Sequence, residues 1–326
     1  MKILVTGVAG FIGMHVAQRL LATGHTVRGL DNLNAYYDVR LKNYRLAGLQ
    51  NNQNFDFIKL DLKDREAVAN LFDQEHYDVV IHLAAQAGVR YSLEAPFEYV
   101  DSNLVGFMAI LEGVRAQGCP HFIYASSSSV YGENSKVPFE EDDRVDEPAS
   151  LYAATKKANE LMAHSYASLY KIPTTGLRFF TVYGPAGRPD MAPWLFTEAI
   201  FSGEPIRVFN NGEMYRDFTY IDDIVDGVEQ VIHEAPSSDN LHRVLNIGRG
   251  SPVSLMEFIG AIERALGEKA TKNFTDMQLG DVKQTFASMR KLNSLTGYSA
   301  RVGTEEGVAR FVDWFSKEWL PYLEEA

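Results

Sequence analysis

The fold of this chain is decided by the stretch Lys2-Ile3-Leu4-Val5-Thr6-Gly7-Val8-Ala9-Gly10-Phe11-Ile12-Gly13. An apolar, β-branched run leads into three glycines and then into a pattern with helical spacing. A glycine-rich turn in this strand-to-helix context predicts a dinucleotide-binding site. Gly7 would permit the tight turn, Gly10 would let the backbone approach a pyrophosphate, and Gly13 would let the helix pack closely on the strand. The free N–H groups at the start of the helix would then face the diphosphate.

Short β-branched runs alternate with longer helical patterns through the first half of the chain, which is typical of right-handed βαβ units. We expect strands at 2–6, 26–31, 55–60, 79–83, 121–125 and 174–178, and helices at 12–23, 64–73, 99–117 and 151–170. After residue 183, loops rich in Gly and Pro separate shorter elements. We therefore predict an α/β fold, a doubly wound parallel sheet of the Rossmann type. An NAD-binding domain would span 1–182. A smaller, interleaved substrate-binding region would span 183–326, with some segments returning to the sheet.

Composition excludes several classes of protein. With 31 Lys and Arg against 43 Asp and Glu, the formal net charge is −12, which disfavours nucleic acid and anionic membranes as partners. No apolar run approaches the roughly 18 residues of a membrane span. The single cysteine, Cys119, favours a reducing, cytoplasmic location. The eight histidines, including His15, His25, His82 and His164, show no metal-ligand spacing, so we expect no metal.

An acidic residue ends the second expected strand. Asp31 lies 18 residues beyond Gly13, close to the spacing of the carboxylate that accepts hydrogen bonds from the adenosine ribose hydroxyls. A carboxylate there would repel a 2′-phosphate, so NAD is favoured over NADP. The alternative is that Asp31 only starts a turn before Asn32.

Tyr152 and Lys156 lie four residues apart in an expected helix and therefore on one face of it. A free phenol, with a pKa near 10, is a poor base at neutral pH. A neighbouring ammonium and a positive nicotinamide ring would favour the phenolate and make Tyr152 a general base. The run Ser126-Ser127-Ser128-Ser129 follows the fifth expected strand and offers hydroxyl donors, although four serines are also typical of a polar turn.

The glycine spacing and the placement of this Tyr/Lys pair resemble the extended branch of the short-chain dehydrogenase/reductase superfamily over almost the whole chain. The resemblance implies that Asp61-Leu62 lies near the adenine and that Leu83-Ala84-Ala85 lines the cofactor. It also selects Ser127 as the catalytic hydroxyl, because that residue precedes Val130-Tyr131-Gly132. The expected cofactor residues are Gly7, Gly10, Phe11, Ile12, Gly13, Asp31, Asn32, Asp61, Leu62, Leu83, Ala84, Ala85, Tyr152 and Lys156.

Several nucleotide-sugar enzymes of this superfamily begin with oxidation at sugar C4, and the residues after the catalytic hydroxyl separate them. In the dehydratases Asp-Glu follows it, and UDP-glucuronate decarboxylases tend to have Glu at the second position. Here both positions are hydroxyls, Ser128 and Ser129. The remaining chemistry is oxidation, rotation of the ketone and reduction on its other face, which is epimerisation.

The segment 178–191 resembles that of UDP-glucuronate 4-epimerases, and Arg188-Pro189-Asp190-Met191 is its most specific part. UDP-glucose 4-epimerases typically have Asn where Thr181 stands. A sugar carboxylate requires charge-assisted donors, which Arg188, Thr181 and Ser128 would supply. Ala186 departs from the pattern, because many relatives have a second Arg there.

For the rest of the substrate, the resemblance implies that Gln86, Gly88 and Arg90 border the sugar. It also implies that Arg216 reaches the UDP phosphates and that the segment Gly280-Asp281-Val282 closes over them. Gln278 stands where galactose-type epimerases have an Arg, so we expect weaker phosphate contacts there.

These residues predict an NAD-dependent UDP-glucuronate 4-epimerase that interconverts UDP-glucuronate and UDP-galacturonate through a 4-keto intermediate. The alternatives are a UDP-glucose 4-epimerase, a UDP-uronate decarboxylase and, in another class, a non-catalytic NAD-binding sensor. Sensors of that kind usually lack the Tyr or the Lys, and both are present here. By analogy we expect a homodimer paired through the helices at 99–117 and 151–170, with a UDP-uronate as the substrate.

Overall fold

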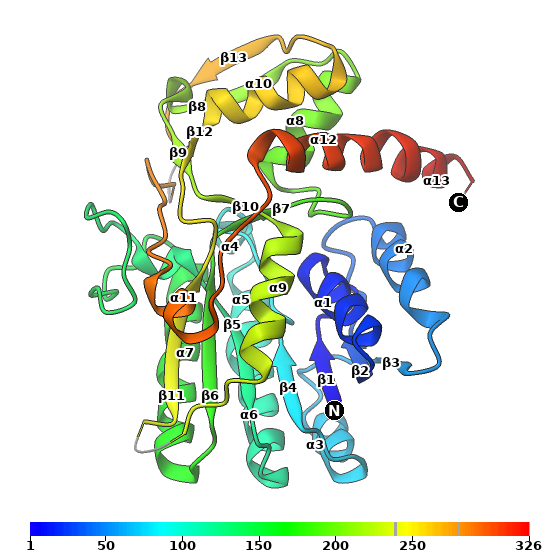
Figure 1. Ribbon diagram of the computed structural model, residues 1–326, viewed down its shortest axis with the longest axis vertical. Coiled ribbons are helices and arrows are strands. Elements are labelled where there is room, and N and C mark those ends of the chain that lie inside the picture. The colour runs from blue at the N-terminus through cyan, green and yellow to red at the C-terminus, as the bar shows by residue number, and fades with distance from the viewer. Residues whose placement is uncertain (238–239, 279–280, 326) are drawn as a thin grey trace.

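The structure, a computed structural model, describes residues 1–237, 240–278 and 281–325. Its centre is a seven-stranded sheet of order β11-β6-β5-β4-β1-β2-β3, in which all neighbouring strands are parallel (Figure 1). The strands are β1 (Lys2–Thr6), β2 (Thr26–Asp31), β3 (Phe55–Lys59), β4 (Val79–His82), β5 (Phe122–Ser127), β6 (Thr174–Phe179) and β11 (His242–Ile247). This is the predicted doubly wound Rossmann fold.

Helices cover both faces of the sheet, because the central strands carry apolar side chains on both faces. In β1, Ile3 and Val5 pack with α1 and α9, whereas Leu4 packs with α3 and α6 on the opposite face. The flanking helices are α1 (Phe11–Ala22), α2 (Val39–Gln50), α3 (Arg65–Gln74), α6 (Gly106–Gln117), α7 (Leu151–Tyr170) and α9 (Ile221–Ile232).

The second region lies beyond the carboxyl ends of the sheet strands (Figure 1). It contains three two-stranded sheets, β7 with β10, β9 with β12, and β8 with β13. Its elements are β7 (Thr181–Tyr183), α8 (Ala192–Phe201), β8 (Ile206–Phe209), β9 (Tyr215–Arg216), β10 (Phe218–Tyr220), β12 (Val253–Ser254), α10 (Leu255–Leu266), β13 (Lys272–Thr275), α12 (Thr304–Trp314) and α13 (Leu320–Glu325). Helix α11 (Arg290–Thr296) instead returns to the sheet and lies beside β11 and α9.

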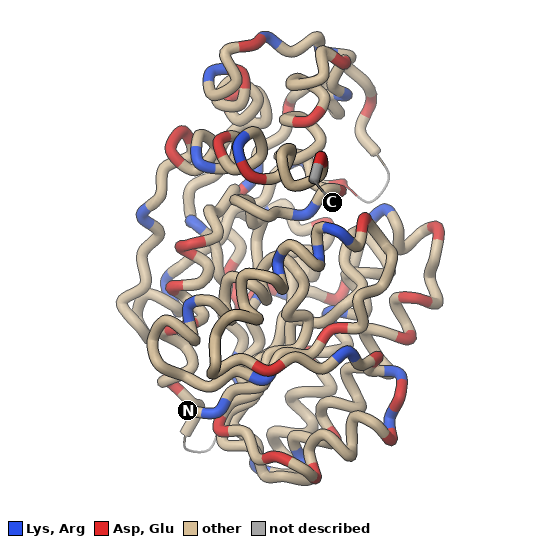
Figure 2. The backbone as a smooth tube through the Cα atoms, turned by 90° about the vertical axis from the view of Figure 1, so that its right-hand side faces the viewer, with Lys and Arg blue, Asp and Glu red and all other residues tan. Residues whose placement is uncertain are grey.

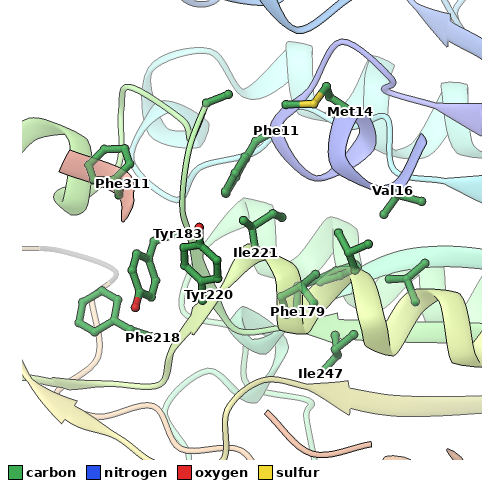
Figure 3. Close-up of a cluster of buried hydrophobic side chains, with 14 of the residues drawn as sticks. Phe11, Met14, Val16, Phe179, Tyr183, Phe218, Tyr220, Ile221, Ile247 and Phe311 are labelled. Carbon is green, nitrogen blue, oxygen red and sulfur yellow. The ribbon is translucent and has the colours of Figure 1, made fainter. Parts of the chain in front are cut away.

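One hydrophobic core joins the two regions. Phe11 of α1 and Ile247 of β11 belong to the same buried cluster as Tyr183, Phe218 and Phe311 (Figure 3). Helix α12 and the turn that follows it dock on this core. Their aromatic side chains are buried against Trp194 of α8, and they are Phe311, Trp314, Phe315 and Trp319. The second region is therefore held against the strand ends by a continuous apolar contact.

The expected sheet strands match the observed ones within two residues, and the helix expected at 151–170 is α7 itself. The prediction of one regular helix at 99–117 was wrong. This segment consists of α5 (Pro96–Val100), a π-helical turn at Asp101–Val105, and α6. A further short helix, α4 (Tyr91–Glu94), precedes it.

Helix α2 was missed. Its buried face contains Lys42 and Arg45 beside Leu41, Leu46 and Leu49, so the apolar residues alone do not trace a helical stripe. A strand at 242–247 was also not predicted individually, and it completes the sheet beside β6.

Charged positions of both signs are interspersed over the outer helices and loops (Figure 2). Among the described residues, no helix combines the length and the apolar character that crossing a membrane requires.

A substitution at Gly113 tests how tightly α3 and α6 pack against each other. A Cβ atom there would lie 2.0 Å from Cδ2 of Phe72, so we expect Gly113→Ala to lower the free energy of unfolding by about 1–3 kcal/mol through overpacking. At Gly260 of α10, a Cβ would approach only the flexible end of Arg264, at 3.3 Å. Gly260→Ala should therefore be neutral or gain up to about 1 kcal/mol from helix propensity. Urea unfolding measures the free energy of unfolding of both variants. Equal values for Gly113→Ala and Gly260→Ala would contradict this packing.

Candidate active site

A cavity of about 350 Å³ runs along the carboxyl ends of the sheet strands. It is lined by every expected cofactor residue and by all three expected catalytic residues. Four expected substrate residues, Gln86, Ser128, Thr181 and Arg188, also line it. Groups separated by up to about 180 residues in the sequence therefore meet in one cleft, at the end of the sheet where ligands bind in such folds.

The glycine-rich turn is as tight as its sequence predicts. Gly7 has a φ of +72°, and its N–H donates to the Leu30 carbonyl at 2.7 Å. A Cβ on Gly13 would lie 2.1 Å from the Gly7 oxygen, so only glycine allows α1 to start this close to β1. Within the described residues, α1 has no side-chain cap at Gly10 and no acidic residue in its first turn. The start of α1 therefore suits a diphosphate.

Asp31 is buried at the end of β2 and does start a turn, accepting from the Leu33 N–H at 2.8 Å. It also accepts from the Ala9 N–H at 3.2 Å, which ties it to the glycine turn. The turn-forming role of Asp31 and its expected role at the cofactor are therefore compatible, because the carboxylate holds a turn and also lines the cavity.

Lys42 is a cavity residue that the sequence analysis missed. Its Nζ donates to Oδ1 of Asn34 at 2.7 Å and lies 3.8 Å from Oδ1 of Asp31. Burial lowers the pKa of Lys42, and the Asp31 carboxylate acts against that shift. The sequence signal that could have identified Lys42 is its position between apolar residues of the same segment.

The Tyr/Lys pair lies at the start of α7, where Ser150 caps the helix by accepting from the Ala153 N–H at 3.1 Å. Lys156 is 3% exposed, and its Nζ donates to the Ala125 carbonyl at 2.9 Å. Burial lowers the pKa of Lys156 to about 8. The helix cap and the strand carbonyl thus fix the direction of both side chains.

The electrostatics of Tyr152 differ from the sequence-based expectation. Burial raises the pKa of Tyr152, while the Ser127 hydroxyl and the positive charge of Arg188 lower it. Lys156 was expected to provide that charge, but its ammonium is directed to the Ala125 carbonyl. Among these influences, the positive charge of Arg188 favours the phenolate and acts against the desolvation of Tyr152.

Two serines of the run, Ser126 and Ser127, lie in different surroundings. Ser126 donates to Oε1 of Glu160 at 2.7 Å, within a buried ion pair of Glu160 and Arg178. Ser127 ends β5, faces the cavity, and accepts from the Ser129 N–H at 3.2 Å. Ser126 is thereby occupied in the core, and Ser127 remains beside Tyr152.

Arg188 enters the cavity already paired with an acid. Its Nε and Nη2 donate to the Asp190 carboxylate at 3.0 and 2.5 Å. Asp190 also accepts from the Tyr36 hydroxyl at 3.0 Å. Burial would lower the pKa of Arg188, but the Asp190 carboxylate holds it above its usual value. The sequence analysis did not identify this acidic partner.

A second cavity of about 730 Å³ adjoins the first, and Ser128, Thr181 and Gly88 line both. Arg90, Arg216 and Gln278 line the second. Arg90, which was expected to border the sugar, directly precedes α4, and its guanidinium stacks over Phe209 at 4.9 Å.

The Asp281 carboxylate lies 3.6 Å from both Arg90 and Arg216. Gly280, expected in the segment that closes over the UDP phosphates, lies outside the residues that the structure describes. Oε1 of Gln278 is buried without a hydrogen-bond partner among the residues that the structure describes.

The π-helical turn also serves the site. It directs the Asn103 side chain onto the main chain of Gln86, accepting from its N–H at 2.8 Å and donating to its carbonyl at 3.0 Å. A third hydrogen bond runs from Nδ2 of Asn103 to the Thr155 hydroxyl of α7 at 3.0 Å. The turn thus locks the end of β4 to the helix of the Tyr/Lys pair, and a π-turn leaves little signature in a sequence.

Comparison with known proteins identifies the family. Residues 3–248 match the NAD dependent epimerase/dehydratase family. The chain belongs to this family. It is an NAD-dependent isomerase by this membership, and the glycine turn and the capless start of α1 fit the dinucleotide.

Three relatives show how far the likeness extends. The probable UDP-glucuronate 4-epimerase of Rhizobium meliloti (strain 1021) is 51% identical, with 98% of each chain covered. The crystal structure of UDP-glucuronic acid 4-epimerase from Bacillus cereus, in complex with UDP-glucuronic acid and NAD, has a TM-score of 0.90. It is 37% identical, with 97% of this chain and 99% of that one covered. UDP-glucose 4-epimerase from Thermotoga maritima, with UDP-glucose, has a TM-score of 0.88 and is 31% identical, with 98% and 100% covered.

The lowered pKa of Lys156 has a consequence for stability. A lysine that loses its proton more readily when folded makes the folded state relatively more stable as the pH rises from about 8 toward 10.5. Lys156→Met lacks this effect, so the stability of the cofactor-free wild type relative to the variant should rise by about 2 kcal/mol between pH 7 and pH 9.5.

Urea titrations at several pH values measure this difference. Lys63→Met, at a side chain 41% exposed, controls for the loss of a lysine charge. A difference between wild type and Lys156→Met that stays constant with pH would show that Lys156 is not desolvated.

Proposed function

We propose that this protein is a UDP-glucuronate 4-epimerase that interconverts UDP-glucuronate and UDP-galacturonate. The observation that carries the proposal is the position of Arg188, which lies in the same cavity as Tyr152 and acts on the pKa of its phenol. A cation in the same cavity as the base suits a carboxylate on the carbon next to the reacting C4 atom. The relatives from Rhizobium and Bacillus support the same substrate.

The bound NAD supplies reversible hydride transfer at sugar C4. Tyr152 takes the proton of the C4 hydroxyl, with the Ser127 hydroxyl hydrogen-bonded to the same oxygen, and returns it after the ketone has turned. Lys156, oriented by the Ala125 carbonyl, holds the nicotinamide ribose. The other expected cofactor residues line the rest of the cleft, and Asp31 receives the adenosine ribose.

The oxidised sugar is a β-keto acid, which loses carbon dioxide when the bond to its carboxylate aligns with the carbonyl π system. We propose that Arg188, Thr181 and Ser128 hold the carboxylate out of that alignment. All three side chains reach the first cavity, and Ser128 and Thr181 also line the second. Arg90, Arg216 and Gln278 would receive the UDP moiety there, and Gln86 would border the sugar.

The Thermotoga relative favours UDP-glucose as a second candidate substrate. A neutral C6 hydroxymethyl group gains little from Arg188, whose charge has no partner on that sugar. A decarboxylase is less compatible with the site, because Ser128 and Ser129 provide no added acid or base.

We further propose a cytoplasmic homodimer, with dinucleotide binding in residues 1–182 and mainly sugar-nucleotide binding in 183–326. Cys119 is buried, and burial raises its thiol pKa to about 11, which suits an inert thiol in a reducing compartment. Leu161 and Leu169 of α7 are exposed apolar residues on one of the helices expected to pair between subunits.

The activity test is incubation of the purified protein with UDP-glucuronate without added NAD, followed by chromatography. We expect UDP-galacturonate to form and no net consumption of cofactor, because the oxidised sugar is reduced again in the same site. Tyr152→Phe should abolish turnover and retain NAD. Full activity in that variant, or UDP-glucose as the only sugar converted, would refute the proposal.

Arg188→Ala tests the role of the cation. Removing a charge-assisted donor should weaken uronate binding by about tenfold and increase the release of carbon dioxide per turnover, measured with substrate labelled at the carboxyl carbon. Arg90→Ala, an arginine of the adjoining cavity, is the matched control and should weaken binding without changing carbon dioxide release. Unchanged uronate affinity and no rise in carbon dioxide for Arg188→Ala would remove this role.

A further inference from the structure

Arg45 of α2 is a fully enclosed cation that the reaction described above does not use. It is 1% exposed, and its guanidinium donates four hydrogen bonds. The acceptors are the carbonyls of Ala186 at 3.0 Å, Ala9 at 3.1 Å and Gly187 at 2.8 Å, and the Tyr37 hydroxyl at 2.6 Å. All four are neutral oxygens, and no salt bridge to Arg45 is present among the described residues.

The three carbonyl acceptors belong to two loops that meet at the active site. Ala9 directly precedes Gly10, where the cofactor helix α1 begins. Ala186 and Gly187 directly precede Arg188. Ala186 has a φ of +54°, a conformation that a residue with a side chain seldom adopts, and its carbonyl is held in that turn by Arg45. One planar side chain therefore sets the position of the glycine turn relative to the Arg188 loop.

The charge of Arg45 is also felt at the cofactor end of the site. After burial, its positive charge is one of the effects that lower the pKa of His15 and of Lys42. His15 lies on α1, and Lys42 lines the cofactor cavity. Arg45 forms no salt bridge among the described residues, although the Asp31 carboxylate also acts on its pKa, and its charge adds to the positive end of the α1 dipole.

We propose that Arg45 is a positioning residue with two effects. Its fork of hydrogen bonds fixes the Arg188 loop against the glycine turn, and its charge strengthens binding of the dinucleotide diphosphate. The first effect rests on the proposed function, since it concerns how the uronate carboxylate is held, and the second does not. The two effects are separable because lysine retains the charge but cannot reproduce a four-bond planar fork.

The test compares Arg45→Lys and Arg45→Met with the wild type. NAD affinity is measured by titrating the cofactor-depleted protein, and the ratio of carbon dioxide released to epimer formed is measured with carboxyl-labelled UDP-glucuronate. Arg45→Met should weaken NAD binding by about tenfold and raise the ratio severalfold. Arg45→Lys should keep NAD affinity within about threefold of the wild type and still raise the ratio.

Arg40→Met is the matched control, because Arg40 lies on the same helix, is exposed, and pairs with Asp38. It should change neither quantity. A purely structural role for Arg45 would lower the folded fraction but would alter neither the dissociation constant of the folded protein nor the product ratio.

The proposal is overturned if folded Arg45→Lys shows the wild-type ratio, or if Arg45→Met binds NAD as the wild type does. Where Arg45→Met does not fold, Tyr37→Phe replaces it, and an unchanged ratio in both Tyr37→Phe and Arg45→Lys overturns the proposal. A wild type that does not convert UDP-glucuronate refutes the proposed function instead, and the NAD titration still decides the charge effect of Arg45.

Discussion

The close approach of α1 to the end of β1 is the constraint on which the rest of the site depends. It requires glycine at position 13, because any Cβ there would overlap the Gly7 carbonyl. That approach places the start of α1 at the strand ends, where its N–H groups and dipole favour a diphosphate. The neighbouring strands then deliver their terminal residues to the same edge, since the strands of the sheet are parallel. Asp31, Ser127 and the loop after β4 therefore line a single cavity.

Desolvation determines the chemistry within that edge. The site encloses a phenol and an ammonium, and burial makes charge harder to hold on both, so it raises the pKa of Tyr152 and lowers that of Lys156. A base that works near neutral pH consequently needs further support from outside the pair. Arg188 provides part of it across the cavity. The same arginine is the expected partner of a uronate carboxylate, so substrate recognition and the activation of the base act through one charge.

Paired charges recur around the cavities. Arg188 is held by Asp190, and Arg90 and Arg216 lie close to Asp281. Such pairing keeps cations in place within a protein of strongly negative net charge, and it lowers the free energy that each cation gains from binding an anionic ligand. Arg45 differs from these three arginines, because all its hydrogen bonds go to neutral oxygens. Its charge is therefore available to the α1 end of the site, and its geometry links that end to Arg188.

The sequence by itself determined six of the seven sheet strands, the glycine turn, the Tyr/Lys helix and many of the residues that line the cleft. These signals are local, because the spacing of apolar residues and the demands of a tight turn are carried by neighbours in the chain. Helix α2 and the π-turn at Asn103 escaped notice because both depend on buried polar groups whose partners are remote in sequence. Only the tertiary structure decided that Arg188 is paired with Asp190, that Lys156 is directed to Ala125 and that Arg90 lies in the second cavity. Hydrogen bonds and Coulomb interactions depend on distances in space, and the folding of the chain alone sets those distances.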